Sequence, residues 1–134
     1  MAISMEKKAE LVARGEEARQ NAYAPYSNYP VGAALLTASG QIHTGANVEN
    51  ASYPLSMCAE RVAVLKAVTS NDREPVAISV VTDNGGSPCG ACRQVLSEFG
   101  LDTLVIMADG EGVIVKELTV RELLPEAFTP EHLT

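Results

Sequence analysis

Short, nearly unbroken apolar runs along this chain predict β-strands. Two of these runs, Val76–Thr82 and Leu104–Ala108, are rich in β-branched residues. Runs of that length and composition are typical of strands buried on both faces of a sheet. Three further segments have strand-like composition and adjoin tight turns that contain glycine: residues 31–37, 41–48 and 113–118. The pattern therefore predicts five strands.

Amphipathic segments lie before and between these strands. Residues 4–22 place Leu11, Ala18 and Ala22 on one stripe, with charged residues elsewhere. Ser4 is suited to cap the first turn, because its side chain can accept a hydrogen bond from a backbone N–H. The first segment of the chain is therefore predicted to be a helix.

Three more helices are predicted further along the chain. One covers residues 58–69, and a short one covers residues 120–124. The third helix lies between these two. Ser87 is suited to be its N-cap, Pro88 fits its first helical position and Gly100 is its candidate C-cap.

The order of these elements indicates an α/β fold. The helix after Pro88 connects two buried strands, which predicts a parallel pair with a right-handed crossover. Ligands of open α/β sheets bind outside the carboxyl ends of strands, where helix N-termini point. Glu49 follows one strand, and Cys58 and Cys89 begin the next two helices, so these segments are expected to converge on one crevice. With 134 residues, the chain is expected to form a single domain over residues 1–134.

Composition and charge narrow the range of partners. The net charge is −7, and lysines and arginines are scattered and outnumbered, which argues against binding of a nucleic acid polymer. No run of about 18 apolar residues predicts a membrane span. The first ten residues lack the basic start and apolar middle of a signal peptide, so the expected location is cytoplasmic. An odd number of cysteines, three, also argues against a disulfide framework.

The three cysteines have the spacing of metal ligands. Cys89 and Cys92 are three residues apart at a predicted helix start, where the helix dipole favours thiolates. With Cys58 they provide three ligands for Zn²⁺, whereas structural zinc sites usually have four. His43 lies within a predicted strand and His132 near the end of the tail, so neither has ligand spacing to a cysteine. A water molecule is then expected in the fourth position, and zinc can lower its pKa to about 7.

Charged residues adjoin the cysteines. Glu60 lies two positions after Cys58, so it can approach the bound water from the side instead of coordinating the metal. Such a carboxylate can accept the proton of the water and deliver it to a substrate. Arg61 and Arg93 each adjoin a cysteine segment, and one or both are expected to donate hydrogen bonds to thiolate sulfur, which would offset the negative charge of the site.

The motifs Cys-Ala-Glu-Arg at residues 58–61 and Pro-Cys-Gly-Ala-Cys-Arg-Gln at residues 88–94 together resemble the cytidine deaminases. The chain is most similar to their small homotetrameric branch with three cysteine ligands. Further matches follow in the expected order: Tyr-Ala-Pro-Tyr-Ser at 23–27, Val-Gly-Ala-Ala-Leu at 31–35, Asn-Val-Glu-Asn-Ala at 47–51, and Glu-Leu-Leu-Pro at 122–125 with Phe128. The resemblance implies a three-layer α/β/α sandwich, with a five-stranded mixed sheet and helices on both faces.

The resemblance also implies an activity. A protein of this family would bind one Zn²⁺ per subunit and deaminate cytidine and deoxycytidine to uridine and deoxyuridine, a step of pyrimidine salvage. Water activated by the zinc would attack C4 of the pyrimidine, and Glu60 would move the protons before ammonia leaves.

Roles for the substrate-binding residues come from the same resemblance. Asn47 and Glu49 would bind the ribose hydroxyls of a small-molecule nucleoside. Tyr29 stands where the family often has phenylalanine beside the base. Phe128 and Tyr53 would reach the active site of a neighbouring subunit, so that active sites are shared within a homotetramer.

Two alternative functions are also compatible with the sequence. A related deaminase could act on another aminopyrimidine, such as a nucleoside antibiotic. Alternatively, the chain could be a zinc-stabilised binding module without turnover, its metal shell completed by His43.

Overall fold

The computed structural model describes residues 2–133, and its centre is one mixed sheet of five strands in the order β2-β1-β3-β4-β5. The predicted strands agree with the observed ones to within two residues at each end, and β4 agrees at both ends. The observed bounds are β1 Gly32–Thr37, β2 Ile42–Ala46, β3 Pro75–Val81, β4 Leu104–Ala108 and β5 Ile114–Thr119.

The central strands β3 and β4 are parallel, which confirms the predicted pair. Their register places Ala77 opposite Leu104 and Val81 opposite Ala108. The other pairs, β1 with β2, β1 with β3 and β4 with β5, are antiparallel. The last five residues of β3 and the last four of β4 are buried, as expected for strands covered on both faces.

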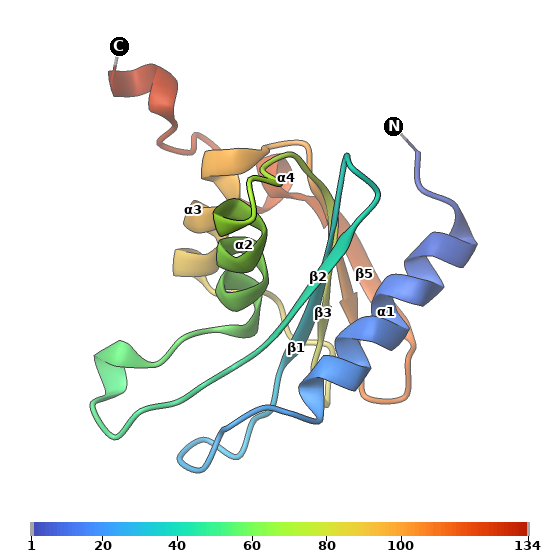
Figure 1. Ribbon diagram of the computed structural model, residues 1–134, viewed down its shortest axis with the longest axis vertical. Coiled ribbons are helices and arrows are strands. Elements are labelled where there is room, and N and C mark those ends of the chain that lie inside the picture. The colour runs from blue at the N-terminus through green and yellow to red at the C-terminus, as the bar shows by residue number, and fades with distance from the viewer. Residues whose placement is uncertain (1, 134) are drawn as a thin grey trace.

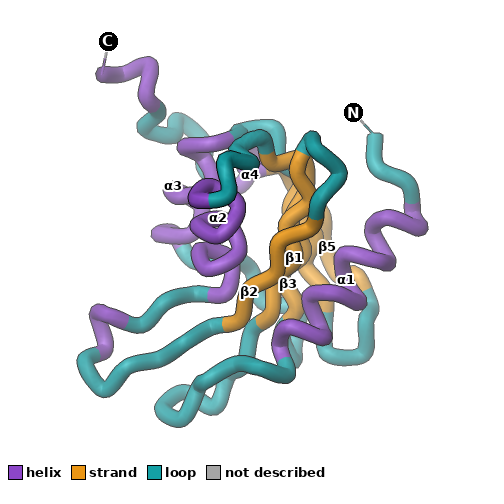
Figure 2. The backbone as a smooth tube through the Cα atoms, in the orientation of Figure 1, coloured by secondary structure: helices purple, strands orange, loops and turns teal. Residues whose placement is uncertain are grey.

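Helices cover both faces of the sheet (Figures 1 and 2). Helix α1 (Met5–Arg19) packs on one face, whereas α2 (Ala59–Thr69) and α3 (Gly90–Phe99) lie side by side on the other. A separate hydrophobic core fills each interface. This arrangement confirms the three-layer α/β/α sandwich. Three short helices complete the described chain: η1 (Tyr53–Leu55), α4 (Val120–Leu123) and η2 (Pro130–Leu133).

Helix α1 begins as predicted but uses a different face. The Ser4 side chain accepts a hydrogen bond from the backbone N–H of Lys7, which confirms the N-cap. The predicted stripe is partly wrong, because the buried residues of the helix are Leu11, Val12 and Gly15, and the helix ends at Arg19. With its 15 residues α1 is the longest helix between residues 2 and 133, and none of these helices has the length and apolar character needed to cross a bilayer.

Close backbone contact explains why the glycine belongs to the buried face. A Cβ atom at Gly15 would lie 2.8 Å from Ser79 Oγ, and one at Gly32 would lie 1.9 Å from the carbonyl oxygen of Gly15. Ser79 Oγ also donates a hydrogen bond of 2.7 Å to the carbonyl oxygen of Leu11. The helix therefore rests on the sheet with no side chain between the two backbones at this point.

The start of α3 differs from the prediction. Cys89 is the N-cap and Gly90 the first helical residue, so Ser87 and Pro88 precede the helix. Ser87 Oγ accepts a hydrogen bond of 2.7 Å from Arg93 Nη2 instead of a backbone N–H. Gly100 is the C-cap, as predicted, although its φ of −176° is ordinary extended backbone.

The contact between α1 and β1 gives a stability prediction. We expect Gly32→Ala to lower the free energy of unfolding by about 3 kcal/mol. The new methyl group would overlap the carbonyl oxygen of Gly15, which can move only together with the backbone of α1. Urea denaturation of proteins with equal metal content measures the change. Gly90→Ala is the matched control, since a Cβ atom there meets nothing within 4 Å. Equal destabilisation of the two variants would show that the contact is not tight.

Candidate active site

Three cysteine sulfur atoms meet where α2 and α3 begin. Cys58 is the N-cap of α2, Cys89 is the N-cap of α3, and Cys92 lies in the first turn of α3. The Sγ atoms of Cys89 and Cys92 are 3.4 Å apart, those of Cys58 and Cys89 are 3.9 Å apart, and all three lie within 4.8 Å of one another. The predicted convergence of these segments is confirmed.

The spacing of the sulfur atoms fits a zinc ion. Tetrahedral coordination at a Zn–S distance of about 2.3 Å places sulfur atoms about 3.8 Å apart. Both helix N-termini point toward the cluster and favour thiolates there. Within residues 2–133 no histidine or carboxylate joins the three cysteines as a ligand. The donor set therefore offers three protein ligands, as in catalytic rather than structural zinc sites.

His43 is held away from this cluster. It lies in β2, and its Nε2 atom is 2.8 Å from Asp72 Oδ2. The same carboxylate oxygen accepts hydrogen bonds from Thr37 and Ser39, and the hydrogen bond to His43 is the main cause that lowers the pKa of Asp72. The prediction of His43 as a strand residue is confirmed, and the module with His43 as fourth ligand is contradicted.

Arg61 supplies positive charge beside the sulfur atoms. Its Nη2 atom donates a hydrogen bond of 3.3 Å to Cys58 Sγ, and this contact raises the pKa of the guanidinium. Hydrogen bonds from Cys92 and Arg61 lower the pKa of the Cys58 thiol to about 5. The pKa of Cys92 is raised, because its thiol donates to the Cys58 thiolate and is buried. Arg61 Nε is buried without a hydrogen-bond acceptor among the described residues.

Arg93 does not have the predicted role. Its three donor groups bind the carbonyl oxygen of Pro88 at 2.9 Å, the carbonyl oxygen of Leu123 at 2.8 Å and Ser87 Oγ at 2.7 Å. The prediction that one or both arginines donate to a cysteine sulfur is therefore confirmed through Arg61, whereas Arg93 has other partners. Residues adjacent on a helix point about 100° apart, so Arg93 points in a different direction from Cys92 and ties the loop before α3 to the last residue of α4.

Glu60 is the buried acid of the site. It is the second residue of α2 and is 5% exposed. Burial disfavours the charged carboxylate and raises the pKa of Glu60 to about 6. A carboxyl group with a pKa in this range can both accept and donate a proton near neutral pH.

A cavity of about 250 Å³ connects Glu60 with the predicted nucleoside-binding residues. Its lining comes from two sets of elements: Cys58, Glu60 and Cys89 belong to the starts of α2 and α3, and Tyr29, Asn47 and Glu49 belong to the loops before β1 and after β2. The remaining lining residues are Ser27, Val31, Ala59, Val80, Thr82 and Ser87. Its volume suits a small ligand. A larger groove of about 730 Å³ between α1 and β5 contains none of the predicted site residues.

Hydrogen bonds to the backbone hold the side chains of Asn47 and Glu49 in place. Asn47 Oδ1 accepts a hydrogen bond of 2.9 Å from the N–H of Val31, and Asn47 Nδ2 donates one of 3.0 Å to the carbonyl oxygen of Tyr29. Glu49 Oε1 accepts hydrogen bonds from the N–H groups of Tyr26 and Ser27, at 3.0 and 3.1 Å. The Ser27 hydroxyl donates to the other oxygen of Glu49, and this bond is the main cause that lowers the pKa of Glu49. Both side chains are therefore held in one orientation.

Three hydroxyl-bearing residues of this cavity, Ser27, Thr82 and Ser87, were not predicted as site residues. Ser27 is the last residue of the motif at positions 23–27, and its hydroxyl orients the carboxylate of Glu49. Thr82 and Ser87 follow β3. Their position after the carboxyl end of a parallel strand could have marked them as candidates for ligand contact. Their individual contacts depend on loop geometry, which the sequence pattern did not reveal.

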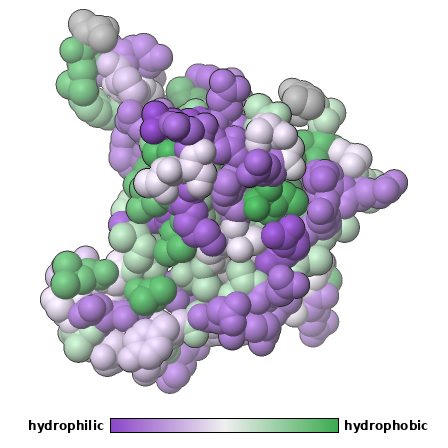
Figure 3. Space-filling model, viewed as in Figure 1, coloured by the Kyte–Doolittle hydropathy of each residue, from purple (hydrophilic) through white to green (hydrophobic). Residues whose placement is uncertain are grey.

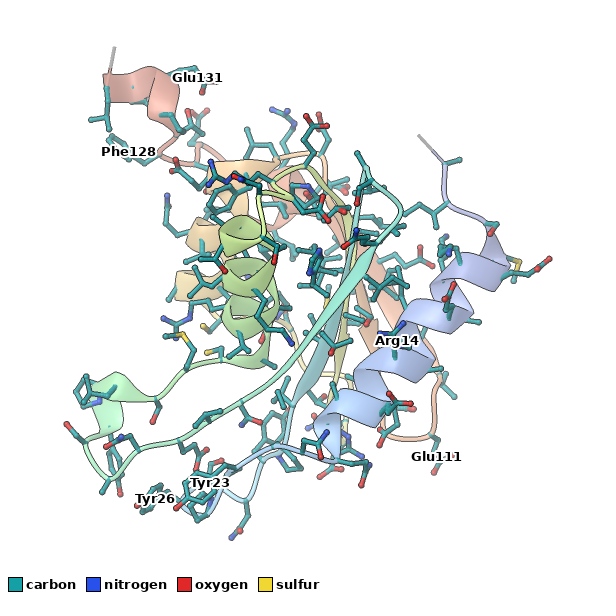
Figure 4. The ribbon with its side chains drawn as sticks, viewed as in Figure 1. Arg14, Tyr23, Tyr26, Glu111, Phe128 and Glu131 are labelled. Atoms are coloured by element: carbon teal, nitrogen blue, oxygen red, sulfur yellow. The ribbon has the colours of Figure 1, made fainter. Side chains whose placement is uncertain are left out.

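Phe128 and Tyr53 lie outside the cavity. Phe128 lies on the tail (Figure 4) and is 56% exposed. Its ring stacks on that of His132, with centroids 5.4 Å apart. Tyr53 is 70% exposed in η1, with its ring centroid 5.8 Å from that of Tyr26. We call η1 and the loop residues that flank it the arm. Figure 3 shows hydrophobic residues on this arm, to which the exposed Leu55 belongs. Their contact with a neighbouring subunit stays a prediction.

Comparison with known proteins agrees with this geometry. The family model described as the cytidine and deoxycytidylate deaminase zinc-binding region matches residues 5–108. A cytidine deaminase of Halalkalibacterium halodurans is 50% identical over 126 residues, which cover 92% of this chain and 95% of the relative. A cytidine deaminase of Sporosarcina psychrophila is 46% identical over 126 residues, with 92% and 93% coverage.

A solved structure has the same fold. The crystal structure of cytidine deaminase from Burkholderia pseudomallei superposes with a TM-score of 0.86 at 43% identity, covering 94% of this chain and all of that one. The match of the family model spans most of the chain, including all three clustered cysteines and Glu60. This chain belongs to the cytidine and deoxycytidylate deaminase family and carries that family's zinc-binding region.

Proposed function

We propose that this protein is a zinc-dependent cytidine deaminase, which hydrolyses cytidine and deoxycytidine to uridine and deoxyuridine with release of ammonia. The observation that carries the proposal is the buried Glu60 beside a three-sulfur cluster in one small cavity. The relatives described as cytidine deaminases, at 46% and 50% identity, support the choice of base.

Cys58, Cys89 and Cys92 would hold one zinc ion per subunit, and a zinc ion in such a site supplies an activated water as nucleophile at neutral pH. In the reaction a C–O bond forms at C4 of the pyrimidine and the C4–N bond to the amino group breaks. Glu60 accepts a proton from the water and delivers it to the ring nitrogen. It then accepts the remaining proton of the oxygen now bonded to C4 and transfers it to the amino group, so that C4 keeps a carbonyl oxygen and ammonia leaves. Its raised pKa of about 6 suits this alternation.

Asn47, Glu49 and Tyr29 would orient the nucleoside in the cavity. Asn47 and Glu49 would bind ribose hydroxyls, since each is fixed by backbone contacts and keeps free hydrogen-bonding capacity. Tyr29 would lie beside the base. The carboxylate of Glu49 and the net charge of −7 favour a neutral nucleoside over a phosphorylated one.

The proposal extends to the pathway, the cellular location and the assembly of the enzyme. The enzyme would act in pyrimidine salvage in the cytoplasm, as a homotetramer whose active sites are shared. Exposed aromatic residues support the sharing: Phe128 is on the tail and Tyr53 on the arm, and neither contributes to the cavity of its own subunit.

Replacement of Glu60 tests the chemistry. We expect Glu60→Gln to reduce kcat for cytidine about 1,000-fold, because the amide cannot transfer the protons. Ultraviolet absorbance follows turnover, and metal analysis checks that one zinc per chain is retained. Glu98→Gln, at an exposed position of α3, is the control and keeps full activity.

The outcome separates the rival functions. A wild-type protein that binds zinc but releases no ammonia would support the non-catalytic module. Faster turnover of an aminopyrimidine antibiotic than of cytidine or deoxycytidine would support the second deaminase function.

Replacement of Arg61 tests the charge balance. We expect Arg61→Ala to weaken zinc binding about tenfold in competition with a chelator, because the Cys58 thiolate loses its hydrogen-bond donor. Arg121→Ala removes an exposed arginine paired with Asp102 and serves as the control. Unchanged zinc affinity and an unchanged pH–rate profile in Arg61→Ala would contradict this role.

Replacement of Phe128 tests the shared site. We expect Phe128→Ala to lower kcat/KM about tenfold with zinc retained, since an aromatic contact at an interface contributes 1 kcal/mol or more. Leu133→Ala, at a 77% exposed position of the same tail, is the control. If subunits share sites, co-refolding Glu60→Gln chains with Phe128→Ala chains restores part of the activity. Absence of any recovery, together with normal kinetics of Phe128→Ala, would reject the shared site.

A further inference from the structure

A side-chain hydrogen bond joins two loops that each contribute residues to the cavity. The Tyr29 hydroxyl donates to Asn84 Oδ1 at 2.7 Å, across 55 positions of sequence. Tyr29 belongs to the loop that holds Glu49, whereas Asn84 belongs to the loop between β3 and α3. That second loop leads directly to Ser87 and Cys89, both of which line the cavity.

The hydroxyl lies against the backbone of this loop. A Cβ atom at Gly86 would be 2.5 Å from the Tyr29 hydroxyl oxygen, so only glycine leaves room for the tyrosine. The N–H of Gly86 donates a hydrogen bond of 2.7 Å to Thr82 Oγ1, which folds the loop back on the end of β3. Thr82 is 2% exposed and lines the cavity. The position of the loop is thus defined by contacts on both sides of Gly86.

The other end of Tyr29 is bound to the nucleoside side of the cavity. Its carbonyl oxygen accepts a hydrogen bond from Asn47 Nδ2, and its N–H donates one of 3.1 Å to Ser27 Oγ. Ser27 in turn donates to Glu49. A continuous series of hydrogen bonds therefore connects Glu49 and Asn47, through Tyr29, with the loop before Cys89.

We propose that Tyr29 and Asn84 form a clasp that sets the width of the nucleoside cavity, with Asn84 acting as a positioning residue. This inference rests on the proposed deaminase function. The ring of Tyr29 lines the cavity while its hydroxyl holds the opposite loop, so the clasp fixes the distance between the ribose-binding side chains and the zinc-binding side. A phenylalanine at position 29 would keep the ring but release the loop.

The clasp has a specific kinetic consequence. It does not touch Glu60 or the sulfur cluster, so its loss affects how tightly the nucleoside is held more than the proton transfers. One net hydrogen bond corresponds to about a 3- to 10-fold change in an equilibrium constant. Tyr29→Phe and Asn84→Ala are each expected to raise KM for cytidine, and to weaken binding of the product uridine, by about this factor. The expected change in kcat is smaller than twofold.

A double-mutant cycle tests the clasp. Because both single variants break the same bond, Tyr29→Phe/Asn84→Ala is expected to resemble either one rather than their product. Asn84→Asp keeps an acceptor oxygen and is expected to restore KM close to the wild-type value. Tyr23→Phe, at an exposed tyrosine at the start of the same loop, is the matched control. Thermal unfolding of each variant checks the fold, and if Asn84→Ala does not fold, Tyr29→Phe and Asn84→Asp complete the test.

The result distinguishes this inference from the proposed function. Independent, multiplicative effects of the two substitutions, or a lower kcat with unchanged KM, would overturn the clasp. Unchanged KM and uridine affinity in Tyr29→Phe would overturn it as well. A wild-type protein that neither deaminates cytidine nor binds uridine in calorimetry would instead overturn the proposed function.

Discussion

Three sulfur atoms within 4.8 Å of one another require positive charge around them. Thiolates at this distance repel strongly, and the protein offsets the repulsion from several directions. The N-termini of α2 and α3 point at the cluster, and Arg61 donates to Cys58. A divalent cation completes the balance when it is bound. The placement of the two helices is therefore inseparable from the chemistry of the site.

The sheet topology provides this placement. Because β3 and β4 are parallel, the connection between them must cross one face of the sheet, and α3 is that connection. Helix α2 precedes β3 and packs on the same face beside α3. Both helices begin near the edge where β3 ends, so Glu60 and the cysteines meet although Cys58 and Cys89 are 31 positions apart. Burial between these layers also raises the pKa of Glu60.

Much of this arrangement could be predicted from the sequence. Apolar runs identified β3 and β4, and the cysteine motifs identified the three residues whose sulfur atoms cluster, because both signals are strong in the sequence. The errors arose where tertiary contacts decide. Serine is a residue type that often caps helices, but the Ser87 hydroxyl accepts a hydrogen bond from Arg93 and the helix begins at Gly90. Likewise, the buried face of α1 is centred on Gly15, whose role depends on the approach of Gly32 from β1. No periodicity in the sequence contains that information.

The sheet on which α1 rests, through Gly15 and Gly32, separates two regions of the protein. Helix α1 is seated directly on the sheet, on the face opposite to α2, α3 and the cysteines. Its outward side carries exposed residues such as Ala13 and Glu17, with the whole sheet between them and the cavity. This outward side of α1 is consequently a convenient place to attach a fluorophore or a surface linker without altering the groups that perform the reaction.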